Sequence, residues 1–78
     1  MTDLKETLYG IARAIVDKPD EVTILESVDG NDVNLVLSVA ADDMGMVIGK
    51  HGRIAKAIRT VMKAVATADG KRVNIEIR

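Results

Sequence analysis

The chain has 78 residues, of which 47% are hydrophobic and 29% charged, and its formal net charge is −1. It contains no cysteine and one histidine, which excludes a disulfide framework, a thiolate metal site and an imidazole cluster. No apolar run approaches the roughly 20 residues of a membrane span, and the N-terminus has no signal-peptide pattern. We therefore expect one cytoplasmic domain spanning residues 1–78, with no membrane association, no metal and no cofactor.

The charges are divided unevenly along the chain. Residues 1–49 hold three bases against ten acids, a net charge of −7, whereas residues 50–72 hold seven bases against one acid, a net charge of +6. Such a basic stretch is either a solvated helix face or a stripe that binds phosphates. The motif at the start of this stretch, described below, favours the phosphate stripe.

Apolar residues spaced by three or four positions predict a first helix over residues 3–17. Asp3 is a candidate N-cap, Glu6 its capping-box partner, and Pro19 a stop signal. The apolar face consists of Leu4, Leu8, Ile11 and Ile15.

Two segments of alternating apolar and polar residues then predict a β-hairpin around the turn sequence Asp-Gly-Asn-Asp at residues 29–32. The apolar positions are Val22, Ile24 and Val28 before the turn, and Val33, Leu35, Leu37 and Val39 after it.

Residues 41–48 are predicted to form a short helix led by two aspartates, and a longer helix follows. Lys56, Arg59 and Lys63 fall opposite the apolar face of the longer helix, where solvent or a ligand can reach them. Asp69 and Gly70 end this helix, and alternation over residues 73–77 predicts a last strand, giving an α+β fold of order α-β-β-α-α-β. The apolar face of the longer helix consists of Ile54, Ile58, Val61, Met62 and Val65.

A Gly-x-x-Gly loop at residues 49–52 joins the two helices and is the most informative segment. The glycines let the backbone turn sharply and approach a ligand closely. Lys50 and His51 place hydrogen-bond donors at the loop tip, and the unpaired N–H groups that begin the next helix favour an anion. The loop is therefore predicted to bind phosphates.

The segment Val47-Ile48-Gly49-Lys50-His51-Gly52, followed by Ile54 and Ile58, resembles the KH (K homology) RNA-binding domain, in particular the small stand-alone bacterial KH proteins of the KhpA type. The resemblance implies a single type II KH-like domain, with three helices on one face of a mixed three-stranded sheet. It implies single-stranded RNA as the ligand, held over about four nucleotides. The RNA-binding residues carried over from the family are Ile48, Gly49, Lys50, His51, Gly52, Arg53, Ile54 and Lys56.

We expect the bases to enter an apolar groove between the two helices and the second strand, near residues 36–40. Aromatic stacking is not expected, because the chain has no Phe or Trp and Tyr9 lies in the first helix. The resemblance also implies a homodimer, or a heterodimer with a larger KH-containing protein, and a role as an RNA chaperone or post-transcriptional regulator in cell shape and cell-wall biogenesis. The long helix, with its small and apolar residues Ala57, Val61, Ala64 and Ala68, is the first candidate for the dimer surface.

Other functions fit the sequence less well. A P-loop is excluded, because three rather than four residues separate Gly45 from Gly49 and His51 stands where a Ser or Thr would bind magnesium. We expect no catalytic residues, because His51 has no partner for acid-base chemistry. A helix-turn-helix DNA-binding protein stays open as an alternative, although Ile54 and Ala55 cannot read base edges. A protein-interaction module that does not bind nucleic acid is the other alternative.

Overall fold

The computed structural model describes residues 3–78, except for the side chain of Lys50. Its elements follow the predicted order α-β-β-α-α-β. They are α1 (Leu4–Ile15), η1 (Pro19–Glu21), β1 (Thr23–Asp29), β2 (Asp32–Ser38), α2 (Ala41–Ile48), η2 (Lys50–Gly52), α3 (Arg53–Ala68) and β3 (Arg72–Ile77), where η1 and η2 are short 3-10 turns.

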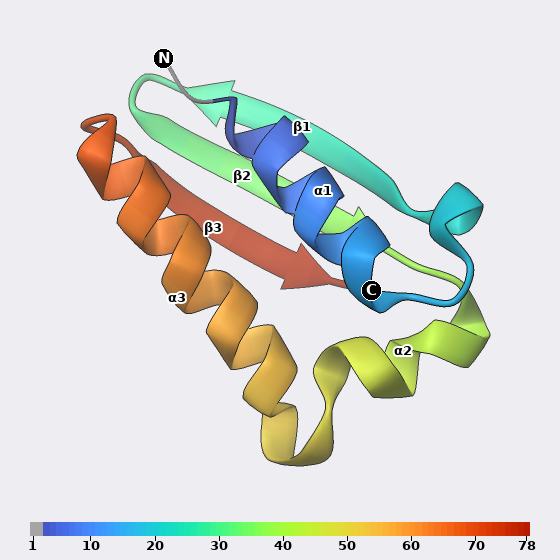
Figure 1. Cartoon of the computed structure of the whole chain (residues 1–78). Coiled ribbons are helices and arrows are strands. Elements are labelled where there is room, and N and C mark those ends of the chain that lie inside the picture. The colour runs from blue at the N-terminus through green and yellow to red at the C-terminus, as the bar shows by residue number, and fades with distance from the viewer. Residues whose placement is uncertain (1–2) are drawn as a thin grey trace.

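The three strands form one mixed sheet in the order β1-β2-β3. The hairpin pairs β1 with β2 antiparallel, while β2 and β3 pair in parallel, with Leu35 opposite Ile75. A parallel pair needs a long crossover, and α2, the loop and α3 supply it. Figure 1 shows α1 lying over the sheet and α3 running alongside β3. The predicted arrangement of three helices on one face of a mixed three-stranded sheet is confirmed.

The core lies between this sheet and the helices and is centred on β2, which has a strand on each side. Two residues that were expected in the core have side chains that are about half exposed or more. Val28 is 60% exposed although its partner Val33 is buried, because Val28 lies on the edge strand β1, and Val61 is 49% exposed on the outer side of the α3 apolar stripe. The buried core includes Leu4, Leu8, Ala12, Val33, Leu35, Leu37, Val47, Ile58, Met62 and Ala66.

The first helix begins as predicted and ends earlier than predicted. The Asp3 carboxylate accepts hydrogen bonds from the backbone N–H groups of Lys5 and Glu6, at 3.1 and 3.3 Å. The helix stops at Ile15 rather than at residue 17, because the N–H groups of Asp17 and Lys18 donate to the carboxylate of Asp43 on α2 instead of to helix carbonyls. Pro19 therefore starts the turn η1 and does not end α1.

The third helix ends in a Schellman motif at the predicted Asp69 and Gly70. Gly70 has a φ of 71°, and the N–H of Lys71 donates to the carbonyl of Ala66 at 2.8 Å. The motif turns the chain directly into β3, so the basic side of α3 and the outer edge of β3 run next to each other. Among residues 3–78 there is no helix with the length and apolar character to cross a bilayer.

Candidate nucleic-acid interface

The Gly-x-x-Gly loop has a backbone that requires its glycines. Gly49 ends α2 with a φ of 70°, and Gly52 begins α3 with a φ of 70°, a left-handed conformation that favours glycine. Gly49 is also limited by space, because a Cβ there would lie 3.1 Å from Cγ1 of Ile54. The N–H of Gly52 donates back to the carbonyl of Gly49 at 3.4 Å, which closes the loop.

His51 is held at the tip of this loop in an unusual conformation. Its φ is 56°, and within the described backbone it is the only residue other than glycine with a positive φ. A side chain in this region costs about 1 kcal/mol or more, and such strain is concentrated at functional sites. The imidazole is exposed to solvent. The loop therefore holds this side chain in solvent at some cost in stability.

The N-terminus of α3 has no capping side chain. Gly52 occupies the N-cap position, and the first turn contains no acidic residue. Arg53 and Lys56 are both exposed in this turn. The first N–H groups of the helix, the positive end of its dipole and the two side chains therefore combine at one place, which is an arrangement that attracts an anion.

The exposed basic residues of α3 are not neutralised. Within the described part of the chain no ion pair engages Arg53, Lys56 or Lys63, so their charges are available to a ligand. The ion pairs that do form lie elsewhere and join Lys18 to Asp42 at 2.8 Å, Arg72 to Asp32 at 3.4 Å and Arg78 to Glu76 at 3.2 Å.

A groove runs between the basic side of α3 and the outer edge of β3. The Nε of Arg59 donates to the carbonyl of Ile75 at 3.3 Å and so ties the helix to the strand edge. A hollow of about 280 Å³ lies here, and a second hollow of about 260 Å³ shares three of its residues and continues toward the start of β3. The first is lined by Arg59, Lys63, Val73, Asn74 and Ile75.

Residues 36–40 of the second strand, which were expected to meet the bases, do not line this groove, and where bases bind stays a prediction. Because β2 is the central strand, Leu37 is fully buried and Ala40 is buried as well, while Val36 faces away from the helices. The strand beside α3 is β3, which was predicted as an element but not as a groove wall.

The predicted RNA-binding residues lie within about one helical turn of the loop on either side. Ile48, His51, Arg53 and Lys56 are exposed, whereas Gly49, Gly52 and Ile54 are half-buried and Ile54 packs against Gly49. The role predicted for the Lys50 side chain lies outside the described residues.

Comparison with known proteins assigns the chain to a family. The family model for the KH domain of KhpA/KhpB matches residues 5–77. The chain belongs to this KhpA/KhpB KH-domain family. The protein named RNA-binding protein KhpA from Clostridium acetobutylicum is 54% identical over 74 residues, which cover 95% of this chain and 99% of that protein. Its namesake from Treponema pallidum is 49% identical over 78 residues, covering 99% of this chain and 98% of the relative.

The match to the KhpA/KhpB family includes every element that builds the interface, from α1 to β3. The resemblance seen in the sequence around the loop is thus confirmed across nearly the whole chain.

Proposed function

We propose that residues 1–78 act as one domain that binds single-stranded RNA, without catalysis or a cofactor, as an RNA chaperone or post-transcriptional regulator. The relatives described above are named as RNA-binding proteins. The observation that carries the proposal is the uncapped N-terminus of α3. It directly follows the strained Gly-x-x-Gly loop, and the exposed basic residues of α3, which form no ion pairs, begin there.

The loop would hold the RNA backbone. Phosphate oxygens would accept hydrogen bonds from the N–H groups that begin α3. Gly52 leaves the backbone open to close approach, and Gly49 makes room for Ile54 beside the loop. His51 would add a hydrogen-bond donor on one side of Gly52 and Arg53 donors and a positive charge on the other, and the sequence adds Lys50 at the tip. Because these contacts release counterions, three or four of them predict a slope of log affinity against log salt of about −2 to −3.

The bases would lie along the groove between α3 and β3. Ile48 and Ile54 offer apolar contact next to the loop, and the β3 edge offers aliphatic side chains and backbone groups further along. Bases can enter such a groove only when they are unstacked and unpaired, so single strands would bind better than duplexes.

The helix-turn-helix alternative is less consistent with this geometry. A recognition helix reads bases with the side chains of its first turns. In α3 those positions include Ala55, which is buried, and Ile54, which is half-buried against Gly49. The start of α3 can therefore present donors to a phosphate but few side chains to a base edge.

The loop is tested by replacing Lys50 and His51 with Asp. We expect binding to a labelled single-stranded RNA, followed by fluorescence anisotropy, to fall at least about 100-fold, because the variant opposes carboxylates to phosphates. Circular dichroism should be unchanged. The matched control is the double variant Lys5→Asp with Gly10→Asp, which makes the same change in net charge at exposed positions of α1. A Cβ at Gly10 would meet no atom within 4 Å, so the new side chain has room there.

If the loop variant binds RNA as tightly as this control, the loop is structural and the proposed site is wrong. Tighter binding of duplex DNA than of single-stranded RNA by the wild-type protein would favour the helix-turn-helix alternative.

We also propose that the protein forms a homodimer through an apolar hollow between α1 and α3. The hollow has a volume of about 360 Å³, and Val61 stands beside it with about half of its side chain exposed. A second copy could bury this surface about a two-fold axis, in which each copy offers the same patch. A dimer would also bring two weak RNA sites together. The lining residues are Ile11, Ile15, Arg53, Ile54, Ala57, Ile58 and Val61.

Analytical ultracentrifugation tests the dimer. We expect the wild type to be dimeric at micromolar concentration and Val61→Lys to be monomeric, because the charge would be buried without a partner. Thr60→Lys is the control, since Thr60 is exposed one position away and does not line the hollow. A wild type that is monomeric at every concentration would contradict the homodimer and leave the heterodimer with a larger KH-containing protein.

A further inference from the structure

The short helix α2 leads directly into the Gly-x-x-Gly loop and has little stability of its own. It has eight residues, its N-cap residue Ala40 makes no side-chain hydrogen bond, and Gly45 lies in its interior. An isolated helix of this length is not stable in water, and an interior glycine costs about 0.5–1 kcal/mol relative to alanine. The position of α2 therefore depends on contacts with the rest of the protein.

Two residues on one side of α2 provide those contacts. Asp43 and Val47 are four positions apart, so they lie on the same face of the helix, and they are the two residues of α2 that are buried. Val47 joins the apolar core near the loop. Asp43, at the other end of the helix, is only 2% exposed although it carries a carboxyl group.

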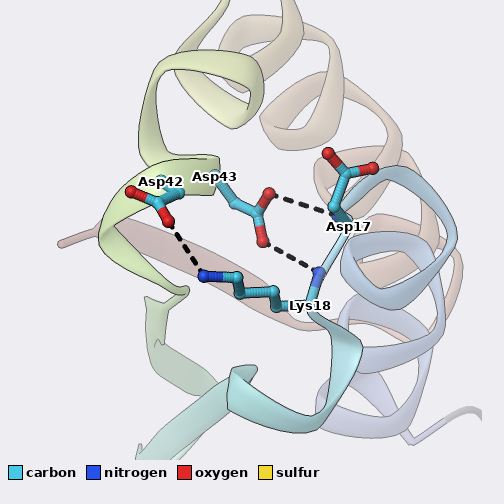
Figure 2. Close-up of polar contacts among 4 residues, drawn as sticks. All are labelled: Asp17, Lys18, Asp42 and Asp43. Carbon is cyan, nitrogen blue, oxygen red and sulfur yellow. Dashed lines mark hydrogen bonds and ion pairs between the residues drawn. The ribbon is translucent and has the colours of Figure 1, made fainter.

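The Asp43 carboxylate joins α2 to the segment that follows α1. Its Oδ1 accepts from the backbone N–H of Asp17 at 3.2 Å, and its Oδ2 accepts from the backbone N–H of Lys18 at 3.0 Å. Figure 2 shows the carboxylate lying between the first turn of α2 and this segment. Both oxygens are used, so one side chain satisfies two N–H groups that have left the α1 hydrogen-bonding pattern.

We propose that Asp43 is a positioning residue for the RNA-binding loop, an inference that rests on the function proposed above. It fixes the beginning of α2 while Val47 fixes the end, and together they set where Ile48 and Gly49 enter the loop. Without the carboxylate, α2 would rotate about Val47 and the loop would occupy its binding geometry for only part of the time. The apparent RNA affinity would then fall in proportion to the fraction of molecules with the loop in place.

The neighbouring pair of Asp42 and Lys18 provides an internal control. It joins the same two segments at 2.8 Å, and its hydrogen bond raises the pKa of Lys18 above the ordinary value. Both side chains are largely exposed, so water screens the pair and its effect on the position of α2 is small. The variants Asp43→Asn and Asp42→Asn therefore remove the same charge from adjacent residues, one buried and one exposed.

The test measures RNA affinity and amide hydrogen exchange well below the unfolding temperature. We expect Asp43→Asn to bind single-stranded RNA about fivefold more weakly than the wild type, because an amide offers one acceptor where the carboxylate offers two. Exchange should accelerate at least about tenfold in residues 43–52 and much less in β2, since local opening is confined to α2 and the loop. Asp42→Asn should match the wild type within about twofold in both measurements.

A purely structural role for Asp43 would give a different result. It would lower the stability of the whole domain and speed exchange everywhere, while the folded molecules bound RNA as before, and that result would overturn the proposal. Asp43→Glu provides a second variant, because it keeps the charge but lengthens a buried side chain by one methylene. We expect it to fold and to lose about threefold in affinity, whereas an unchanged affinity and unchanged exchange in α2 would count against the positioning role.

The two proposals fail in different ways. If the wild-type protein does not bind single-stranded RNA, the proposed function is wrong, and the exchange data alone decide whether Asp43 positions α2. If the wild type binds and Asp43→Asn binds equally well, only the role of Asp43 is wrong.

Discussion

The helices α1 and α3 begin in opposite ways. At the start of α1, the Asp3 carboxylate accepts hydrogen bonds from two N–H groups of the first turn, and Glu6 places a negative charge near the positive end of the helix. At the start of α3 stands Gly52, with a left-handed backbone, no side chain and no acidic residue in the following turn.

Stability alone does not explain this difference. A capping side chain contributes about 1 kcal/mol to a helix, and α3 is the longer of the two helices and carries more of the core. The chain uses the cap where the helix end has only a structural role and omits it where the N–H groups face the proposed phosphate site. The comparison thus separates a helix start that is capped by a side chain from one that is left uncapped beside the proposed phosphate site.

Among variants that compare the two helix starts, the largest expected effect comes from placing a carboxylate at the uncapped start of α3. In Gly52→Asp a carboxylate would compete with phosphate for the first N–H groups of α3, whereas Gly52→Asn has almost the same shape and no charge. Both residues tolerate the left-handed region, and a Cβ at this position meets no atom within 4 Å. We expect Gly52→Asp to bind RNA about 20-fold more weakly than Gly52→Asn, measured by anisotropy at equal salt. Equal affinities would mean that the open N-terminus does not hold phosphate.

A smaller effect is expected on stability, and it has opposite signs at two glycines, Gly45 inside α2 and Gly49 at its C-terminal end. Gly49→Ala should destabilise the domain by about 1.5 kcal/mol, because its φ is 70° and the new Cβ would press on Ile54. Gly45→Ala should stabilise it by about 0.5–1 kcal/mol, because the position is helical and open. Urea denaturation measures both. Equal stability of the two variants would show that the loop backbone relaxes without strain.

The smallest effect is expected at the N-terminus of α1, which Asp3 caps. Asp3→Ala should lower the free energy of unfolding by about 1 kcal/mol, because two N–H groups lose their acceptor, and should lower the melting temperature by about 4–8 °C. Its RNA affinity should equal that of the wild type. Asp20→Ala removes the same charge from an exposed turn and is the control. A loss of RNA binding in Asp3→Ala would show that the two helix starts are coupled.

Local patterns in the sequence were enough to predict most of the fold. Alternation located the hairpin and the last strand, and helical spacing with Asp3, Asp69 and Gly70 located the long helices to within about two residues. The spacing of Val28 and Val61 placed them on apolar faces, but burial also depends on how far the neighbouring elements extend, which spacing does not record. The Gly-x-x-Gly loop was recognisable because its motif consists of adjacent residues.

The parts that sequence reasoning missed depend on residues far apart in the chain. The groove between α3 and β3 needs the parallel pairing of β2 with β3, and the family resemblance gave the type of sheet without showing which strand lies beside α3. The sequence pattern indicates only that Asp43 lies at the beginning of a helix, where Asp residues are common. Its contact with residues 17 and 18 spans about 25 positions, and its burial became visible only in three dimensions.

The parallel pairing of β2 with β3 also affects the order in which the domain can assemble. The β1–β2 hairpin is a local structure that can form as soon as its own residues have been synthesised. The pairing with β3 joins residues about 40 positions apart, and such non-local pairing forms slowly because a long loop must close first. Because synthesis starts at the N-terminus, the ribosome releases the acidic half of the domain before the basic half. The strand β3, which forms one side of the groove, is released after the other described elements. The nascent chain thus carries the Gly-x-x-Gly loop before it has a completed groove beside it.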